Sequence, residues 1–65
     1  MQIYDLTVPE LNRYRELCNF LDDELEFFNL RARGKSLIQI AIAMNVSESQ
    51  ASILSKKVKS KMERV

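Results

Sequence analysis

The segment 36–58 most constrains how this 65-residue chain folds, because it holds two helical patterns with almost nothing between them. Apolar residues recur in both at the spacing of a buried helical face: Leu37, Ile40, Ala41 and Met44, then Ala51, Leu54 and Val58. Asn45 and Val46 stand at the join. Asparagine readily adopts the left-handed conformation that ends a helix sharply, and Val46 would fill the inside of the corner. We therefore expect two helices packed across a short turn, a helix-turn-helix.

Both helices are expected to begin at a serine. Ser36 is followed three residues later by Gln39, and Ser47 by Gln50, which is the spacing of a capping box. In such a box the serine hydroxyl accepts a hydrogen bond from a backbone N–H of the first turn, and the glutamine side chain bonds back to the cap. The first helix should then cover 37–44, and the second should begin at residue 48 and end near residue 62.

Ten residues of the region 25–62 follow one order and spacing: Arg31, Gly34, Lys35, Ser36, Ile40, Ala41, Val46, Ser47, Ser49 and Ser52. In this pattern the region resembles the helix-turn-helix of LuxR-type regulators and of bacterial sigma-factor region-four domains. The resemblance implies an all-α fold without a wing, in which a three-helix unit places its last helix in the major groove of DNA. Three positions depart from those families. Ile53 and Leu54 stand where arginine or another polar residue is usual, and Ser55 where a branched apolar residue is usual.

The length of the chain allows one domain, 1–65, which we divide into an arm with an extra helix, 1–20, and a DNA-binding three-helix unit, 21–62. A chain this short buries only about 60% of the surface that its unfolded form exposes. Cys18 is the single cysteine and histidine is absent, so neither an internal disulfide nor a Cys/His zinc site is available. Because self-association is the remaining way to bury more apolar surface, we expect a homodimer.

No cofactor, small-molecule substrate or membrane partner is expected. No stretch of the sequence approaches the roughly 18 apolar residues of a membrane span, and no basic-then-apolar leader opens it. A lone cysteine suits a reducing compartment, so we expect a cytoplasmic protein. Enzymatic activity is not expected either, because Gly34 is the only glycine and no serine has a recognisable base beside it. The acidic cluster at 22–26 fits the start of a helix better than a metal site.

Charge is divided between the two halves of the chain, although the net charge is only +1. Residues 1–30 hold seven acidic and two basic side chains, a net charge of −5, and residues 31–65 hold eight basic and two acidic ones, a net charge of +6. We expect a positive face that binds phosphates and an acidic face behind it. The alternative is two oppositely charged surfaces that pair across a dimer.

A further helix is expected ahead of the three-helix unit. Residues 1–6 are treated as a short extended arm. Thr7 and Glu10 then have the spacing of a capping box, with Pro9 in the first turn of the helix. The apolar residues of this helix form one stripe: Leu11, Tyr14, Leu17, Cys18 and Leu21. The helix is expected to end near Cys18.

The boundary after this helix depends on two competing patterns. Apolar spacings of three and four residues continue as they would in one unbroken helix over 9–33 with a coiled-coil seam. Asn19, Asp22 and Asp23 are cap residues, however, and acidic side chains suit the positive end of a new helix. We favour a break near Asn19 to Leu21 and a new helix that begins at Asp22 or Asp23, runs to about Arg33 and is ended by Gly34. It should bury Leu25, Phe28 and Ala32, with Phe27 or Leu30 facing the first helix.

The helix over 37–44 is apolar on nearly every side. Ile38, Ile42 and Ala43 lie outside the apolar stripe that is expected to face the core. A helix with apolar residues on every side is normally packed against other parts of a protein on every side. We expect the extra first helix to cover Ile38 and Ile42. A contact between two copies at the same patch is the alternative.

The predicted DNA contacts lie mainly on the last helix. The residues expected to read bases are Ser49, Gln50, Ser52 and Ile53. Those expected to bind phosphates are Arg33, Lys35, Ser47, Lys56, Lys57 and Lys59. Glutamine can pair bidentately with adenine, but Gln50 is equally well explained as the capping partner of Ser47.

These residues favour a transcriptional regulator that binds double-stranded DNA, and a phage or mobile-element origin is left open. The alternative is that the same fold serves as an assembly module that contacts polymerase or another regulator. Its protein interface would be formed by Ile38, Ile42 and Ile53.

Overall fold

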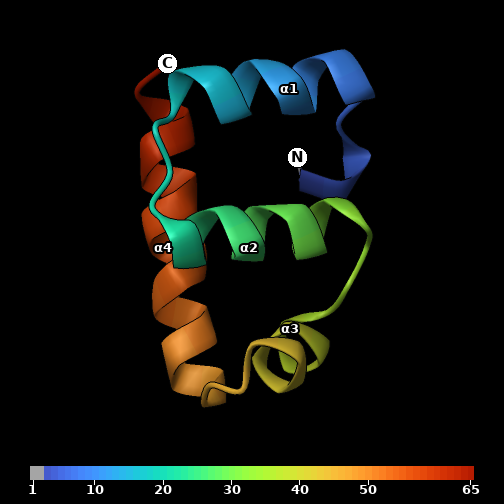
Figure 1. Cartoon of the computed structure of the whole chain (residues 1–65), viewed down its shortest axis with the longest axis vertical. Helices are drawn as coiled ribbons and strands as arrows, with labels where there is room; N and C mark the ends of the chain where they lie inside the picture. The colour runs from blue at the N-terminus through green and yellow to red at the C-terminus, as the bar shows by residue number, and fades with distance from the viewer. Residues whose placement is uncertain (1–2) are drawn as a thin grey trace.

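The computed structural model describes residues 3–65, and this part of the chain is all-helical. A short 3-10 helix precedes four α-helices: η1 (Ile3–Asp5), α1 (Val8–Leu17), α2 (Asp22–Ala32), α3 (Leu37–Met44) and α4 (Glu48–Glu63) (Figure 1). In Figure 1, α1 and α2 lie one above the other, α4 stands along one side of them, and α3 lies below α2. The predicted all-α fold with four helices is confirmed. Within residues 3–65, no helix has the length and apolarity needed to cross a bilayer.

The chain breaks between α1 and α2, so the alternative of one helix over 9–33 is wrong. Helix α1 begins with the predicted capping box, in which the Thr7 hydroxyl accepts from the Glu10 N–H and the Glu10 carboxylate accepts from the Thr7 N–H at 2.9 Å. Asn19 then takes φ 54°, the left-handed conformation that asparagine tolerates better than other non-glycine residues. Gly34 ends α2 with φ 84°, as expected for a residue just past a helix end.

Residues 3–6 do not form the extended arm that we expected. They make a 3-10 turn with Ile3 and Leu6 buried, and the Leu6 N–H donates to the Ile3 carbonyl at 3.1 Å. Side chains three residues apart eclipse one another in such a turn, so both can enter the core beside α2. The part of that expectation that concerns residues 1–2 lies outside the described residues.

The core lies where α2, α3 and α4 meet. Its largest fully buried side chains are Phe27, Phe28, Ile40 and Val58. Ala41, Ala51 and Leu54 are buried as well, as predicted for the inward faces of the last two helices, whereas Leu37 and Met44 of the predicted α3 face are half-buried against the core. On α2 the prediction is only partly right: Phe28 is buried, but Leu25 is half-buried and Phe27 lies in the core.

Helix α1 does not cover α3, contrary to our expectation. Ile38 and Ile42 remain 58% and 75% exposed. Figure 1 shows the reason, because α2 lies between α1 and α3. Helix α1 therefore packs with Leu11 and Cys18 inward and leaves Leu17 half-exposed. The outer side of α3 keeps an apolar surface that no other described part of the chain covers.

Candidate nucleic-acid interface

The corner between α3 and α4 has the conformation that its residues predict. Asn45 has φ 57° and ψ 45°, which is left-handed. The Asn45 N–H donates to the Ile42 carbonyl at 3.2 Å, and the Val46 N–H donates to the Ala41 carbonyl at 3.0 Å. These bonds satisfy carbonyls that the end of a helix leaves free. Three residues therefore separate the end of α3 from the start of α4, and the turn fixes α4 against α3.

The two predicted caps differ in one hydrogen bond. At α3 the box is complete: the Ser36 hydroxyl accepts from the Gln39 N–H at 3.2 Å, and the Gln39 side-chain oxygen accepts from the Ser36 N–H at 2.9 Å. At α4 the Ser47 hydroxyl accepts from the Gln50 N–H at 3.1 Å, without the reciprocal bond. The exposed Gln50 side chain is therefore not used in capping, and its amide can bind a ligand.

Three of the predicted base-reading residues share one hollow with a predicted phosphate contact. The hollow measures about 440 Å³, lies between the start of α3 and the outer side of α4, and is lined by Leu37, Glu48, Ser49, Ser52, Ile53 and Lys56. Spacings of three and four residues place these α4 side chains on one helical face. Ser49 and Lys56 are exposed, Ser52 is half-buried and Ile53 is 49% exposed. The face thus presents hydroxyl, apolar and ammonium groups together.

The lysines of α4 surround this face. Lys56, Lys57 and Lys59 are all exposed, and none of them is in an ion pair within residues 3–65. At 100° per residue, Lys57 lies on one flank of Lys56 and Lys59 on the other. The three ammonium groups are therefore free to meet phosphates on both sides of the helix.

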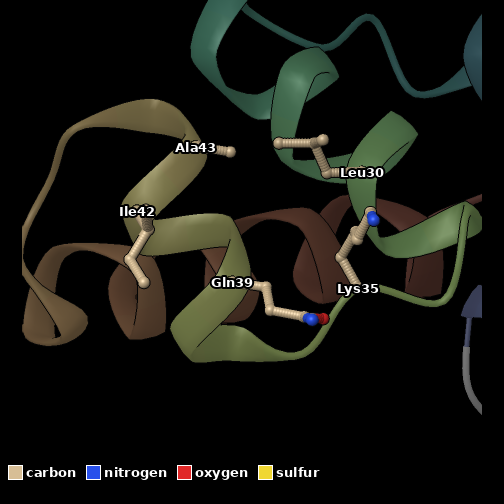
Figure 2. A pocket seen from close by; sticks show the side chains of 5 residues that line it. All are labelled: Leu30, Lys35, Gln39, Ile42 and Ala43. Carbon is tan, nitrogen blue, oxygen red and sulfur yellow. The ribbon is translucent and has the colours of Figure 1, made fainter.

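Arg33 and Lys35 lie elsewhere. Arg33 caps the end of α2 that points away from α4 in Figure 1. Lys35 lies in the connection to α3 and lines a second hollow of about 230 Å³ with Leu30, Gln39, Ile42 and Ala43 (Figure 2). The predicted phosphate contacts are thus separated into an α4 group and a group at the α2–α3 connection.

An ion pair between a buried carboxylate and a half-buried lysine escaped the sequence analysis. Lys61, near the end of α4, donates to the Glu24 carboxylate at 2.5 Å and to the Asn19 carbonyl at 3.4 Å. Glu24 is only 3% exposed and also accepts from the Leu21 N–H at 2.9 Å. The hydrogen bond from Lys61, and then the one from Leu21, lowers the pKa of the Glu24 carboxyl. The spacing of Lys61, three residues after the inward Val58, was the available signal.

Cys18 lies near the same ion pair and is buried with a free thiol. Burial raises the pKa of the Cys18 thiol, since a thiolate is poorly solvated there, and the nearby Lys61 charge acts weakly in the opposite direction. The buried Cys18 thiol is therefore disfavoured from ionising to the thiolate, the reactive form. Across the described residues, Cys, Asp and Glu side chains do not gather in a group of three that could hold a metal ion.

The residues around the α3–α4 corner offer the groups that proteins use on DNA. Amide and hydroxyl side chains can bond to base edges, an isoleucine can contact a thymine methyl, and ammonium groups bind phosphates. They lie on a regular helix that two caps and a tight turn hold in place. Comparison of the chain with protein-family models, curated proteins and solved structures found no match.

Proposed function

We propose that the chain binds double-stranded DNA with a helix-turn-helix formed by α3 and α4, and acts as a transcriptional regulator. The observation that carries the proposal is the shared face of Ser49, Ser52, Ile53 and Lys56 beside the start of α3. In this proposal the face enters the major groove, which admits one α-helix. The resemblance to LuxR-type regulators and sigma-factor region-four domains points to the same pair of helices.

In this proposal each group on α4 has a distinct role. Gln50 pairs with an adenine edge, since its amide is free of the cap. Ser49 and Ser52 bond to bases or phosphates with little selectivity, and Ile53 contacts a thymine methyl. Phosphates on the two flanks are bound by Lys56, Lys57 and Lys59, and by Ser47 at the helix start.

Binding to a fluorescent random-sequence duplex tests the proposal. We expect a dissociation constant of about one micromolar at low salt, and a slope of log affinity against log salt of about −3 if three lysines each neutralise one phosphate. Lys56→Glu should weaken binding to every duplex alike, whereas Arg13→Glu, the same charge change on the exposed side of α1, should have a much smaller effect. No binding, or binding that salt does not weaken, would contradict the proposal.

A second candidate function is protein assembly, and the exposure of α3 favours it. Ile38 and Ile42 lie one helical turn apart and are 58% and 75% exposed, and Ile53 is 49% exposed. Adjacent exposed apolar side chains often mark contacts with another protein, such as polymerase or a regulator. The double variant Ile38→Ser and Ile42→Ser separates the two functions, with Val8→Ser on α1 as the control. Loss of a protein complex with duplex binding intact would favour assembly.

A further inference from the structure

The outer face of α2 carries opposite charges at its two ends. Six residues from Asp22 to Arg33 line an open hollow of about 360 Å³ along it: Asp22, Leu25, Glu26, Asn29, Leu30 and Arg33. Asp22 begins the helix, Glu26 follows one turn later, and Arg33 caps its end. In the described part of the chain, Asp22, Glu26 and Arg33 have no ion-pair partner. The face is therefore negative toward one end and positive at the other, and between them Asn29 accepts a hydrogen bond from Arg15 of α1 at 2.9 Å.

An exposed apolar surface adjoins this face. Leu30 also lines the hollow of about 230 Å³ between α2 and α3, where it points toward Ala43, and Gln39 and Ile42 line the α3 side (Figure 2). Ile42 is 75% exposed, more than any other large apolar side chain that the structure describes. A small domain gains from covering such a surface, because its own core buries only a limited area.

A surface with this charge distribution is complementary to itself. A two-fold axis brings the same patch of two subunits together, so each end of the patch meets the opposite end of its copy. Glu26 and Arg33 are seven residues apart, two helical turns along one side of α2, and the midpoint between them falls between Asn29 and Leu30. An axis through that midpoint pairs each Glu26 with the Arg33 of the second copy.

We propose that α2 and the adjoining side of α3 form a self-association surface, on which a second copy of this chain packs with its α2 antiparallel. The two pairings of Glu26 with Arg33 of the second copy fix how the two α2 helices are aligned, and Leu30 and Ile42 supply the apolar contact. Glu24 and Phe28 of α2 face the core, so the proposed surface lies on the opposite side of the helix from α4. It therefore leaves the face with Ser49 and Lys56 free, and does not rest on DNA binding.

Sedimentation equilibrium of the purified chain at tens to hundreds of micromolar tests the proposal. The wild type should reach twice the monomer mass of 7.6 kDa. Glu26→Lys places a cation against Arg33 of the second copy, and Arg33→Glu places an anion against its Glu26. Because two-fold symmetry repeats each repulsion, either variant should raise the dimer dissociation constant about tenfold or more.

The mixture of the two variants makes the test specific. In a heterodimer of Glu26→Lys with Arg33→Glu, both contacts join opposite charges again, and the double variant restores both in one chain. Each should return to within about threefold of the wild-type constant. Glu16→Lys and Arg13→Glu on the exposed side of α1 are the matched controls and should leave dimerisation unchanged.

Circular dichroism of every variant separates loss of the dimer from loss of the fold. A wild type that stays at 7.6 kDa at the highest concentration would overturn the proposal. So would single variants that dimerise like the controls, or a mixture that fails to restore the dimer. Failure of duplex binding alone would contradict the proposed function and leave this surface standing, since sedimentation is measured without DNA.

Discussion

Asparagine turns this chain twice, between α1 and α2 and again between α3 and α4. Asn19 has φ 54° and Asn45 has φ 57°, so the two backbones bend in nearly the same way. Their surroundings differ. At Asn45 the hydrogen bonds run from the turn back into the last turn of α3. At Asn19 the carbonyl accepts from Lys61, which lies 42 residues further along the chain and also binds Glu24.

The two corners are therefore held by different kinds of interaction. The α1–α2 corner is joined to the end of α4 by the ion pair of the half-buried Lys61 with the buried Glu24, so its stability depends on the whole fold. The α3–α4 corner depends on its own turn and caps, and on the packing of α3 against α4. The conformation of the α3–α4 corner, which carries the proposed DNA-binding face, is thus determined by residues adjacent in sequence. Substitutions elsewhere in the chain should alter this corner only by disturbing the core.

The largest expected difference between the corners comes from removing Lys61. Lys61→Met leaves the Glu24 carboxylate, whose side chain is 4% exposed, without its cation. We expect the free energy of unfolding, measured with urea, to fall by about 3 kcal/mol. The double variant with Glu24→Gln should lose less, because no buried charge remains. Lys59→Met on the exposed side of α4 is the control and should change the free energy by no more than about 0.5 kcal/mol.

Acid should weaken the Lys61–Glu24 ion pair. The Lys61 and Leu21 hydrogen bonds hold the pKa of the Glu24 carboxyl below its ordinary value of 4.5. A carboxyl with a lower pKa in the folded state adds stability above its unfolded pKa, and that stability is lost as the pH falls through the folded pKa. The urea midpoint of the wild type should therefore fall between about pH 5 and pH 3 by more than that of Glu24→Gln. Equal falls would show that other carboxyls carry the acid sensitivity.

Substitution of the asparagines should have similar effects at both corners. Asn19→Ala and Asn45→Ala each keep the β-carbon in left-handed backbone but remove the carboxamide that can hydrogen-bond locally, which should lower the free energy of unfolding by about 1 kcal/mol. Asn19→Gly and Asn45→Gly should stay within about 0.5 kcal/mol of the wild type, because glycine adopts this conformation freely. A much smaller loss for Asn19→Ala than for Asn45→Ala would mean that the ion pair compensates for backbone strain.

The local parts of this structure could be predicted from the sequence, because they depend on residues within one helical turn. The caps at Thr7, Ser36 and Ser47, the left-handed Asn45 and the inward faces of α3 and α4 all follow from short-range spacing. The same holds for the grouping of Ser49, Ser52, Ile53 and Lys56, since helical periodicity places them on one face.

The parts that were missed depend on which helices become neighbours. Periodicity shows that α3 has surplus apolar residues, but not that α2 separates it from α1, so Ile38 and Ile42 were wrongly expected to be covered. In the sequence, Lys61 is one of several lysines near the end of the chain, and nothing there identifies a buried partner. The packing of α4 against α2 brings Lys61 to Glu24. Likewise, Arg33 and Lys35 lie apart from the α4 lysines because α2 runs away from α4 before the connection to α3.

The smallest expected effects distinguish the two capping glutamines. Gln39→Ala removes the hydrogen bond to the Ser36 N–H and should lower the free energy of unfolding by about 0.5 kcal/mol. Gln50→Ala removes no such bond and should leave stability unchanged. In duplex binding the order should reverse: Gln50→Ala should reduce preference for adenine-containing sites by about 1 kcal/mol or more, whereas Gln39→Ala should not. If Gln50→Ala destabilised the fold as much as Gln39→Ala and left the preference among duplexes unchanged, Gln50 would be a cap and not a base contact.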